Sequence, residues 1–203
     1  MASKDPAPRV RLDAQSLRGL AHPLRVRLLG LLRLDGPATA TSLAAIVGES
    51  SGATSYHLRQ LAAYGFVLAD DAPHASRKER WWKAAHRTTV LEPLPDADAS
   101  TTMLVDEYFR SIAWAYSDRI LRFADGASKT RELLGGAWDD VSDLSDWVLQ
   151  LTSEEAAEVS RRVHAVLAEY RISDPQAERA EGSERVIVQL QVMPTVTRVG
   201  GTS

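Results

Sequence analysis

Two short helical segments joined by a turn constrain the fold of this chain more than any other feature. The first begins at a candidate cap, Thr41, and ends at Gly48, a residue type that readily takes the left-handed conformation found at helix C-termini. The second begins at a serine cap, Ser50 or Ser51, and ends before Gly65. Two short helices at this spacing, with glycine in the connection, predict a helix-turn-helix.

The segments on either side extend this pattern. A longer supporting helix is expected from Pro23, because proline is tolerated in a first helical turn. Its apolar face carries Leu24, Leu28, Leu31 and Leu32. After the second short helix, residues 66–69 and 77–84 are predicted to form two strands separated by a polar loop. A hairpin in this place is the wing of a winged helix-turn-helix.

The second half of the chain opens with a long amphipathic helix. Large apolar residues recur at helical spacing from about residue 99 to Phe123, and the helix is expected to end near Gly126. They are Leu104, Val105, Tyr108, Phe109, Ile112, Tyr116, Ile120 and Phe123. A helix of this length must bury its apolar stripe, and we expect it to hold two copies of the chain together as a homodimer.

A further helix and a strand are expected after it. Thr152 and Glu155 have the spacing of a capping box for a helix that runs to about residue 170. Residues 186–192 alternate apolar and polar side chains as a strand does, and they pair either with residues 147–151 or across a dimer. The predicted fold is mainly α with a small β component, in which an N-terminal winged helix-turn-helix domain precedes a helical region with a short β-α-β element.

The net charge of the chain changes sign near residue 91. Residues 1–90 hold thirteen basic and seven acidic side chains, whereas residues 91–203 hold eleven and twenty. A basic first half beside an acidic second half indicates a nucleic-acid-binding module with a second module attached. The predicted organisation is a tail at 1–12, the winged helix-turn-helix domain at 13–91, a proline-containing linker at 92–99, a dimerisation and effector or partner region at 100–196, and a tail at 197–203.

Composition removes several classes of function. The chain has no cysteine, which excludes disulfides and thiolate metal sites, and its five histidines show no metal-ligand spacing. No nucleophile elbow or glycine-rich phosphate loop occurs, so we expect neither an enzyme nor a bound cofactor. Without a long apolar run or a signal peptide, a cytoplasmic protein with no membrane partner is expected.

Three segments carry a family resemblance. Leu20–Leu29, Ser55–Leu61 and Tyr64–Val67 together resemble the ArsR-like winged-helix regulators, in the branch that lacks metal-binding cysteines. The resemblance implies a homodimer that binds a roughly palindromic operator on double-stranded DNA and represses transcription. Metal-sensing members carry cysteines in the first helix of the motif, or histidine and carboxylate ligands after the wing. Residues 39–48 have neither cysteine nor histidine, and residues 98–126 have no histidine.

A recognition helix presents its N-terminal residues to base edges in the major groove, and a wing reaches the minor groove or its flanking phosphates. The expected recognition residues are Ser51, Gly52, Ser55, Tyr56, His57 and Arg59. His57 either contacts DNA or packs partly buried. The expected wing contacts are Arg77, Lys78, Arg80 and Lys83, interleaved with Trp81 and Trp82, of which at least one should be core.

Two other groups of side chains are open to two readings each. Arg25 and Arg27 on the supporting helix either hold a phosphate or form its solvent face. The aromatic residues of the second half either pack the core and dimer or bound an apolar effector pocket. They are Tyr108, Phe109, Trp114, Tyr116, Trp138 and Trp147.

Two functions fit these features. The first is a dimeric, sequence-specific DNA-binding regulator that responds to a non-metal effector. The second is a protein-interaction adaptor that uses the winged helix as a docking surface. The basic wing and the polar recognition face favour the regulator, because a docking surface should expose large apolar side chains there.

Overall fold

The structure is a computed structural model, and its chain divides into two compact units that we describe separately. The first unit consists of residues 1–128 and 173–178, and the second of residues 129–172 and 179–203. The structure describes residues 9–72, 79–91, 94, 97–138, 141–170, 173–177 and 180–195.

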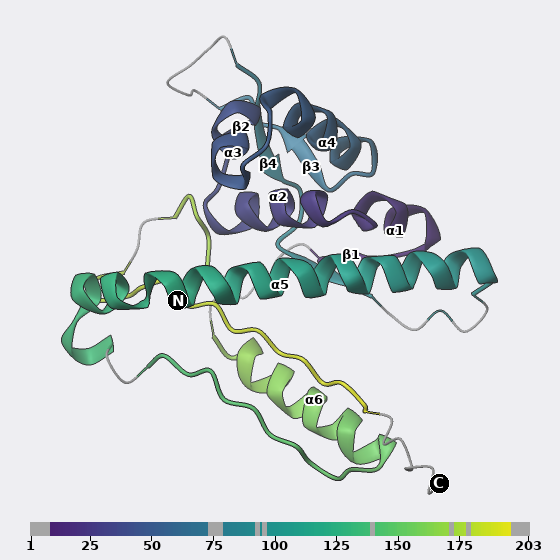
Figure 1. Ribbon diagram of the computed structural model, residues 1–203, viewed down its shortest axis with the longest axis vertical. Coiled ribbons are helices and arrows are strands. Elements are labelled where there is room, and N and C mark those ends of the chain that lie inside the picture. Colours follow the sequence, from purple (N-terminus) through teal and green to yellow (C-terminus); the bar gives the residue numbers. More distant parts are fainter. Residues whose placement is uncertain are drawn as a thin grey trace, which may run out of the picture. The chain divides into compact units, whose positions relative to one another are not determined.

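Helices α1 (Ala14–Leu20) and α2 (Pro23–Leu34) open the first unit (Figure 1). Asp13 caps α1 through a reciprocal pair of hydrogen bonds with Ser16, which satisfies backbone donors at the helix start. His22 caps α2, and Pro23 occupies the first helical turn as its sequence position predicted.

The helix-turn-helix is formed by α3 (Ala40–Val47) and α4 (Ser51–Ala63). Gly48 takes the left-handed conformation, with φ of 76°, and so ends α3. The Oγ atom of Ser50 accepts a hydrogen bond from the Ala53 backbone N–H at 3.1 Å and starts α4. The predicted pair of helices is confirmed, although Thr39 rather than Thr41 caps α3, so the helix begins two residues earlier than expected.

A three-stranded antiparallel sheet supports these helices. Its strands β2 (Ala38–Thr39), β3 (Val67–Ala69) and β4 (Trp81–Ala84) lie in the order β2, β4, β3. The hairpin of β3 and β4 pairs Val67 with Ala84 and Ala69 with Trp82, so the predicted wing is present at its base. The returning strand begins at Trp81 rather than at residue 77, and residues 73–78 lie outside the described residues.

A second, two-stranded sheet joins the two ends of this domain. Strand β1 (Arg9–Arg11) pairs in parallel with β5 (Thr88–Val90), and the Leu12 backbone N–H donates to the Val90 carbonyl at 2.9 Å. Leu12 itself is buried in the core. The residues directly before α1 are therefore part of the folded domain, which differs from the tail expected over 1–12.

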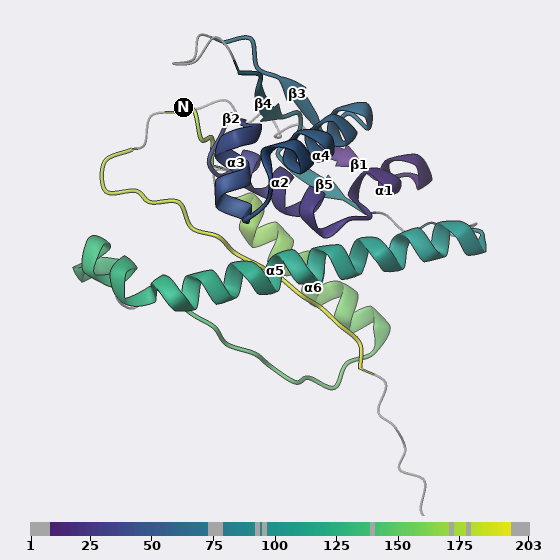
Figure 2. The ribbon, with the colours of Figure 1, turned by 45° about the horizontal axis from the view of Figure 1, so that its top comes forward.

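Helix α5 (Ala99–Leu134) runs beside α1 and α2 in both views of the ribbon (Figures 1 and 2). Its buried face carries Tyr108, Ser111 and Ala115. A Cβ atom added at Gly30 of α2 would lie 3.4 Å from Nη2 of Arg119, so the Arg119 side chain of α5 reaches α2. The winged helix and most of α5 therefore belong to one unit, whereas the sequence placed a domain boundary at 92–99.

The expected end of this helix near Gly126 is wrong, because α5 continues to Leu134. One glycine inside a helix costs only about 1 kcal/mol relative to alanine. The following residues include several good helix formers, among them Ala127, Lys129, Arg131 and Glu132. No helix among the described residues is both long and apolar enough to cross a membrane.

The second unit contains a short 3-10 turn, η1 (Gly136–Trp138), and helix α6 (Ser153–Ala168). The predicted capping box of Thr152 and Glu155 is confirmed. The β-α-β element is wrong, because residues 147–151 and 186–192 join no sheet in the described part of the chain. The alternating pattern of residues 186–192 specifies a strand only when another strand pairs with it, and Val186 and Val188 remain 57% and 61% exposed.

Candidate nucleic-acid interface

Helix α4 divides into a buried face and an exposed polar face. Thr54, Leu58 and Leu61 follow one another at spacings of four and three and are fully buried, which fixes the orientation of the helix. The remaining positions include every recognition residue that the sequence predicted. Ser51, Gly52, Tyr56 and Arg59 are exposed, and Ser55 and His57 are half-buried.

The exposed face begins at the N-terminus of α4. Because Ser50 is the capping residue, Ser51 and Gly52 occupy the first turn of the helix and are exposed to solvent. Helix N-termini carry unpaired backbone donors and a partial positive charge, which favour a phosphate nearby. Farther along, Nε of Arg59 donates to the carbonyl of Ser55 at 3.3 Å, which holds this exposed side chain against its own helix.

A cluster of rings and one cation joins α4 to the start of α2. The rings of His22 and His57 lie 4.4 Å apart between centroids, and the ring of Tyr56 meets that of His57 edge-on at 5.2 Å. Burial lowers the pKa of both histidines, and the neighbouring Arg25 lowers each further. Their packing supports the partly buried alternative for His57.

Arg25 faces this cluster rather than bulk solvent alone. Burial lowers the pKa of its guanidinium, with Tyr64 and Tyr56 as the nearby groups that oppose the shift. Its Nε atom is buried without a hydrogen-bond partner in the described part of the chain. The side chain as a whole is half-buried beside the recognition helix.

The wing base presents one accessible cation and one paired cation. Arg80 is exposed, and its guanidinium carbon lies 5.2 Å from the centroid of the Trp82 ring. Lys83 forms an ion pair with Asp70 at 2.9 Å, and the Asp70 side chain is only 2% exposed. Trp82 is buried and Trp81 half-buried, as strand alternation predicted. Arg77 and Lys78 lie outside the described residues.

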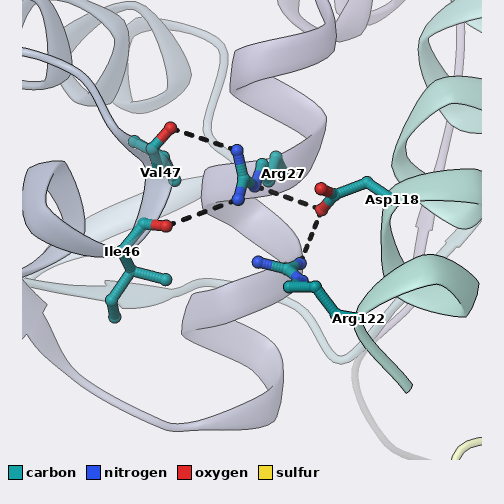
Figure 3. Close-up of polar contacts among 5 residues, drawn as sticks. All are labelled: Arg27, Ile46, Val47, Asp118 and Arg122. Atoms are coloured by element: carbon teal, nitrogen blue, oxygen red, sulfur yellow. Dashed lines mark hydrogen bonds and ion pairs between the residues drawn. The ribbon is translucent and has the colours of Figure 1, made fainter. Parts of the chain in front are cut away.

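Arg27 fits neither alternative that the sequence left open, a phosphate contact or a place on the solvent-exposed face of α2. Its side chain is 14% exposed, and its guanidinium donates to the carbonyls of Val47 at 3.1 Å and Ile46 at 3.4 Å (Figure 3). Nε lies 3.3 Å from a carboxylate oxygen of Asp118 on α5. Arg27 is thus an internal contact between three helices and not a free phosphate ligand.

The aromatic residues of α5 do not share one face. Tyr108 is buried, and burial raises the pKa of its hydroxyl to about 12, while Tyr116 is half-buried. Phe109 is 57% exposed and Trp114 46%, and the Trp114 ring lies 5.7 Å from the Arg27 guanidinium carbon. These four side chains therefore line no common cavity.

The two remaining aromatic candidates lie in the second unit. Trp138 is half-buried at the end of η1, and Trp147 is 75% exposed. Neither belongs to a packed core of that unit, so the structure gives no independent support to an aromatic effector pocket.

Sequence reasoning missed the side chains that hold the domain together from within. Arg33 is largely buried, donates to the His86 carbonyl at 2.8 Å and to the Thr89 hydroxyl at 2.7 Å, and burial lowers its pKa to about 10. Asp118 and Arg122 form an ion pair on α5 at 2.7 Å. Only their spacing of four residues, typical of a helical ion pair, could have indicated the second of these.

Comparison with known families agrees with this geometry. Residues 20–68 match the model of a family described as a helix-turn-helix domain, and the match covers α2, β2, α3 and α4 and reaches into β3. No curated protein matches the chain. Less than half of the chain is matched, and the match includes every predicted recognition residue on α4. The chain therefore contains, over residues 20–68, a helix-turn-helix domain of the kind found in DNA-binding transcription regulators.

Proposed function

We propose that this protein is a sequence-specific transcriptional regulator of the ArsR-like kind, which binds operator DNA as a homodimer and acts as a repressor. The observation that carries the proposal is the polar face of α4. That face exposes Ser51, Gly52, Tyr56 and Arg59 within the residues that match a helix-turn-helix domain.

The side chains on this face suit the major groove. A guanidinium such as that of Arg59 can grip the O6 and N7 atoms of guanine with two hydrogen bonds, and serine hydroxyls can donate or accept at several bases. We assign base reading to Ser51, Ser55, Tyr56 and Arg59 and close backbone approach to Gly52. His57, which packs against His22, serves chiefly to position the helix.

Phosphate contacts surround this reading face in the proposal. Arg80 at the wing base is exposed, and Arg77 and Lys78 extend the same basic stretch in the sequence. Arg25 is half-buried near Tyr56 of α4, so part of its guanidinium remains open to solvent. Contacts of this type supply affinity and register without reading sequence. Lys83 contributes less, because Asp70 already neutralises its charge.

A second apolar stripe on α5 supports the homodimer. Next to the buried face of Tyr108, Ser111 and Ala115, α5 carries apolar side chains at successive spacings of four, three, four, four and three residues, the pattern of a helix that packs on another helix. These are Val105, Phe109, Ile112, Tyr116, Ile120 and Phe123. Val105 and Ile112 pack partly against the core of the first unit, whereas Phe109, Ile120 and Phe123 are 57%, 39% and 36% exposed. We propose that α5 of a second copy covers this stripe.

A two-fold symmetric dimer would bind a DNA site with matching symmetry. Two recognition helices related by symmetry read an inverted repeat, with half-sites about 34 to 36 Å apart, one turn of DNA. A dimer seated on such a site over a promoter excludes polymerase, which is the basis for proposing repression. The absence of cysteine from the whole sequence, and of histidine from residues 98–126, favours a non-metal signal.

The adaptor alternative gains no support from α4. Among the large hydrophobic side chains of that helix, Tyr56 is the one that is exposed, at 54%. A protein-docking face would present several neighbouring apolar groups there.

Capture of DNA fragments tests the proposal. The purified full chain is incubated with sheared genomic DNA from its source, and bound fragments are sequenced beside those bound by Arg59→Ala. The proposal predicts a small set of fragments, enriched over input and containing an inverted repeat, which the variant recovers poorly. Equal recovery of all fragments by both proteins would contradict it.

A further inference from the structure

Arg27 connects the helix-turn-helix to α5 through a single guanidinium group. Its two terminal nitrogens donate to the carbonyls of Val47 and Ile46, the last two residues of α3, at 3.1 and 3.4 Å. Its Nε faces Asp118 of α5 at 3.3 Å (Figure 3).

The contact with α3 lies directly before the turn of the helix-turn-helix. The last carbonyls of a helix have no partner within it and carry partial negative charge, so a cation there is stabilising. Gly48 then reverses the chain, and Ser50 caps α4. Because only residues 48–50 separate the two helices, the position of the α3 end sets the position of the start of α4.

On α5, the Asp118 carboxylate has two cationic neighbours, Arg27 and Arg122. The same Oδ2 atom of Asp118 that faces Arg27 lies 2.7 Å from Nη2 of Arg122, one helical turn along α5. If α5 slides or rotates, Arg122 moves with Asp118 and keeps the carboxylate paired, whereas Arg27 loses it. The Trp114 ring, 5.7 Å from the Arg27 guanidinium carbon, would move away at the same time.

We propose that Arg27 is a positioning residue that transmits the placement of α5 to the turn of the helix-turn-helix, so that events on α5 change DNA affinity through Asp118. The use of this link in regulation rests on the proposed function. The link itself is a property of the free protein. A ligand or partner that shifts α5 acts by removing Asp118 from Arg27, which then holds the α3 carbonyls alone.

The first test needs no DNA. Asp118→Asn removes the charge and keeps the shape of the side chain, and Arg122→Gln is the matched control, because it removes the other partner of the same carboxylate. Backbone amide chemical shifts of residues 46–51 are compared in the full chain. Asp118→Asn should move these signals, although residue 118 is far away in sequence, and Arg122→Gln should leave them in place. Unmoved signals in Asp118→Asn, or equal movement in both variants, would overturn the link.

A second variant checks the geometry from the other side. Arg27→Lys keeps the charge but offers one ammonium group, which cannot hold two carbonyls and a carboxylate in the planar arrangement of a guanidinium. It should move the same amide signals. After that substitution, adding Asp118→Asn should produce little further movement, and a full additional shift would show that the two residues act independently.

The DNA measurement then separates the link from the proposed function. On the best-bound duplex, Asp118→Asn should weaken binding by about tenfold, within the usual range for coupling between sites, and Arg122→Gln by less than twofold. Equal affinities for the two variants would overturn the regulatory role. If the wild-type chain bound no duplex, the proposed function would fail, while the amide shifts would still decide whether Arg27 links α5 to the turn.

Discussion

The imidazole of His22 packs on the imidazole of His57, with 4.4 Å between ring centroids, so the cap of α2 and the recognition helix α4 share one contact. Burial and the nearby Arg25 lower the pKa of both rings, while Glu49 opposes the shift at both and Glu107 opposes it at His22. Both shifts favour the neutral form of the rings at pH 7. Protonation of both rings would place two imidazolium cations beside the Arg25 guanidinium.

This pair predicts that stability falls as the solution is acidified. Each histidine has a folded-state pKa below its unfolded value of about 6.5, so the unfolded chain binds protons first. The stability that the two neutral histidines contribute is fully present above pH 6.5, and it is lost as the pH falls through their folded-state pKa values. Urea unfolding at pH 7.5 and 5.5 measures it, and His57→Gln should reduce the difference between the two conditions. An unchanged difference in that variant would refute the role of the pair.

Gly19 predicts a steric effect inside the domain. A Cβ atom at this position of α1 would lie 2.6 Å from a ring carbon of Phe66 and 2.8 Å from Cβ of Tyr64. Gly19→Ala should therefore lower the free energy of unfolding by about 1 to 3 kcal/mol, the usual cost of overpacking. Gly126→Ala is the control, because nothing lies within 4 Å of its added Cβ, and it should stabilise α5 by about 0.5 to 1 kcal/mol. Equal effects in thermal unfolding would contradict this packing.

The apolar stripe of α5 predicts how the dimer can be broken. Ile120→Glu places a charge on the stripe where the side chain is 39% exposed, so the single chain should still fold. Sedimentation at micromolar concentration should show a monomer for this variant and a dimer for wild type. Leu121→Glu, at a neighbouring residue that is 64% exposed and off the stripe, should remain dimeric. A monomeric wild type, or dissociation by both substitutions, would show that the dimer interface lies elsewhere.

Much of the winged helix could be predicted because its signals are local. Capping residues, left-handed glycines and apolar residues at helical spacing identified α2, α3 and α4, and the hairpin followed from strand-like segments around a polar loop. The N-terminal strand carried no such signal. Arg9–Arg11 is only three residues long. It pairs with Thr88–Val90, which lies almost the whole length of the domain away in sequence, and no local pattern specifies such a contact.

The role of Arg27 could not be predicted for the same reason, because it depends on a contact that is distant in sequence. Arg25 and Arg27 are two positions apart on α2, and helical geometry places them on different faces. Which face each one meets depends on α5, whose Asp118 is distant in sequence. The polar face of α4 could be predicted, because its buried positions are set by the residues of that helix alone. The predicted pairing of residues 186–192 with residues 147–151 is wrong, because an alternating pattern does not specify which strand it pairs with.

Arg80 predicts a change in salt dependence. If its guanidinium contacts a phosphate, Arg80→Ala should weaken binding to every duplex and lower the slope of affinity against salt by about one unit. Arg80→Lys, which keeps the charge, should retain the slope. Lys83→Ala is a poor substitute, since it would leave the buried Asp70 carboxylate without its ion pair and so perturb the fold. An unchanged slope in Arg80→Ala would remove it from the proposed interface.

The central claim is that α4 reads DNA sequence, and the ratio of two affinities tests it most directly. Binding isotherms are recorded at one salt concentration for the best captured duplex and for a scrambled duplex of equal composition. Wild type should prefer the first by at least about 1,000-fold, as specific regulators do. Arg59→Ala should lose about 1 to 3 kcal/mol on that duplex and little on the scrambled one. Equal affinity of the wild-type chain for both duplexes, or an equal loss on both in the variant, would contradict the account.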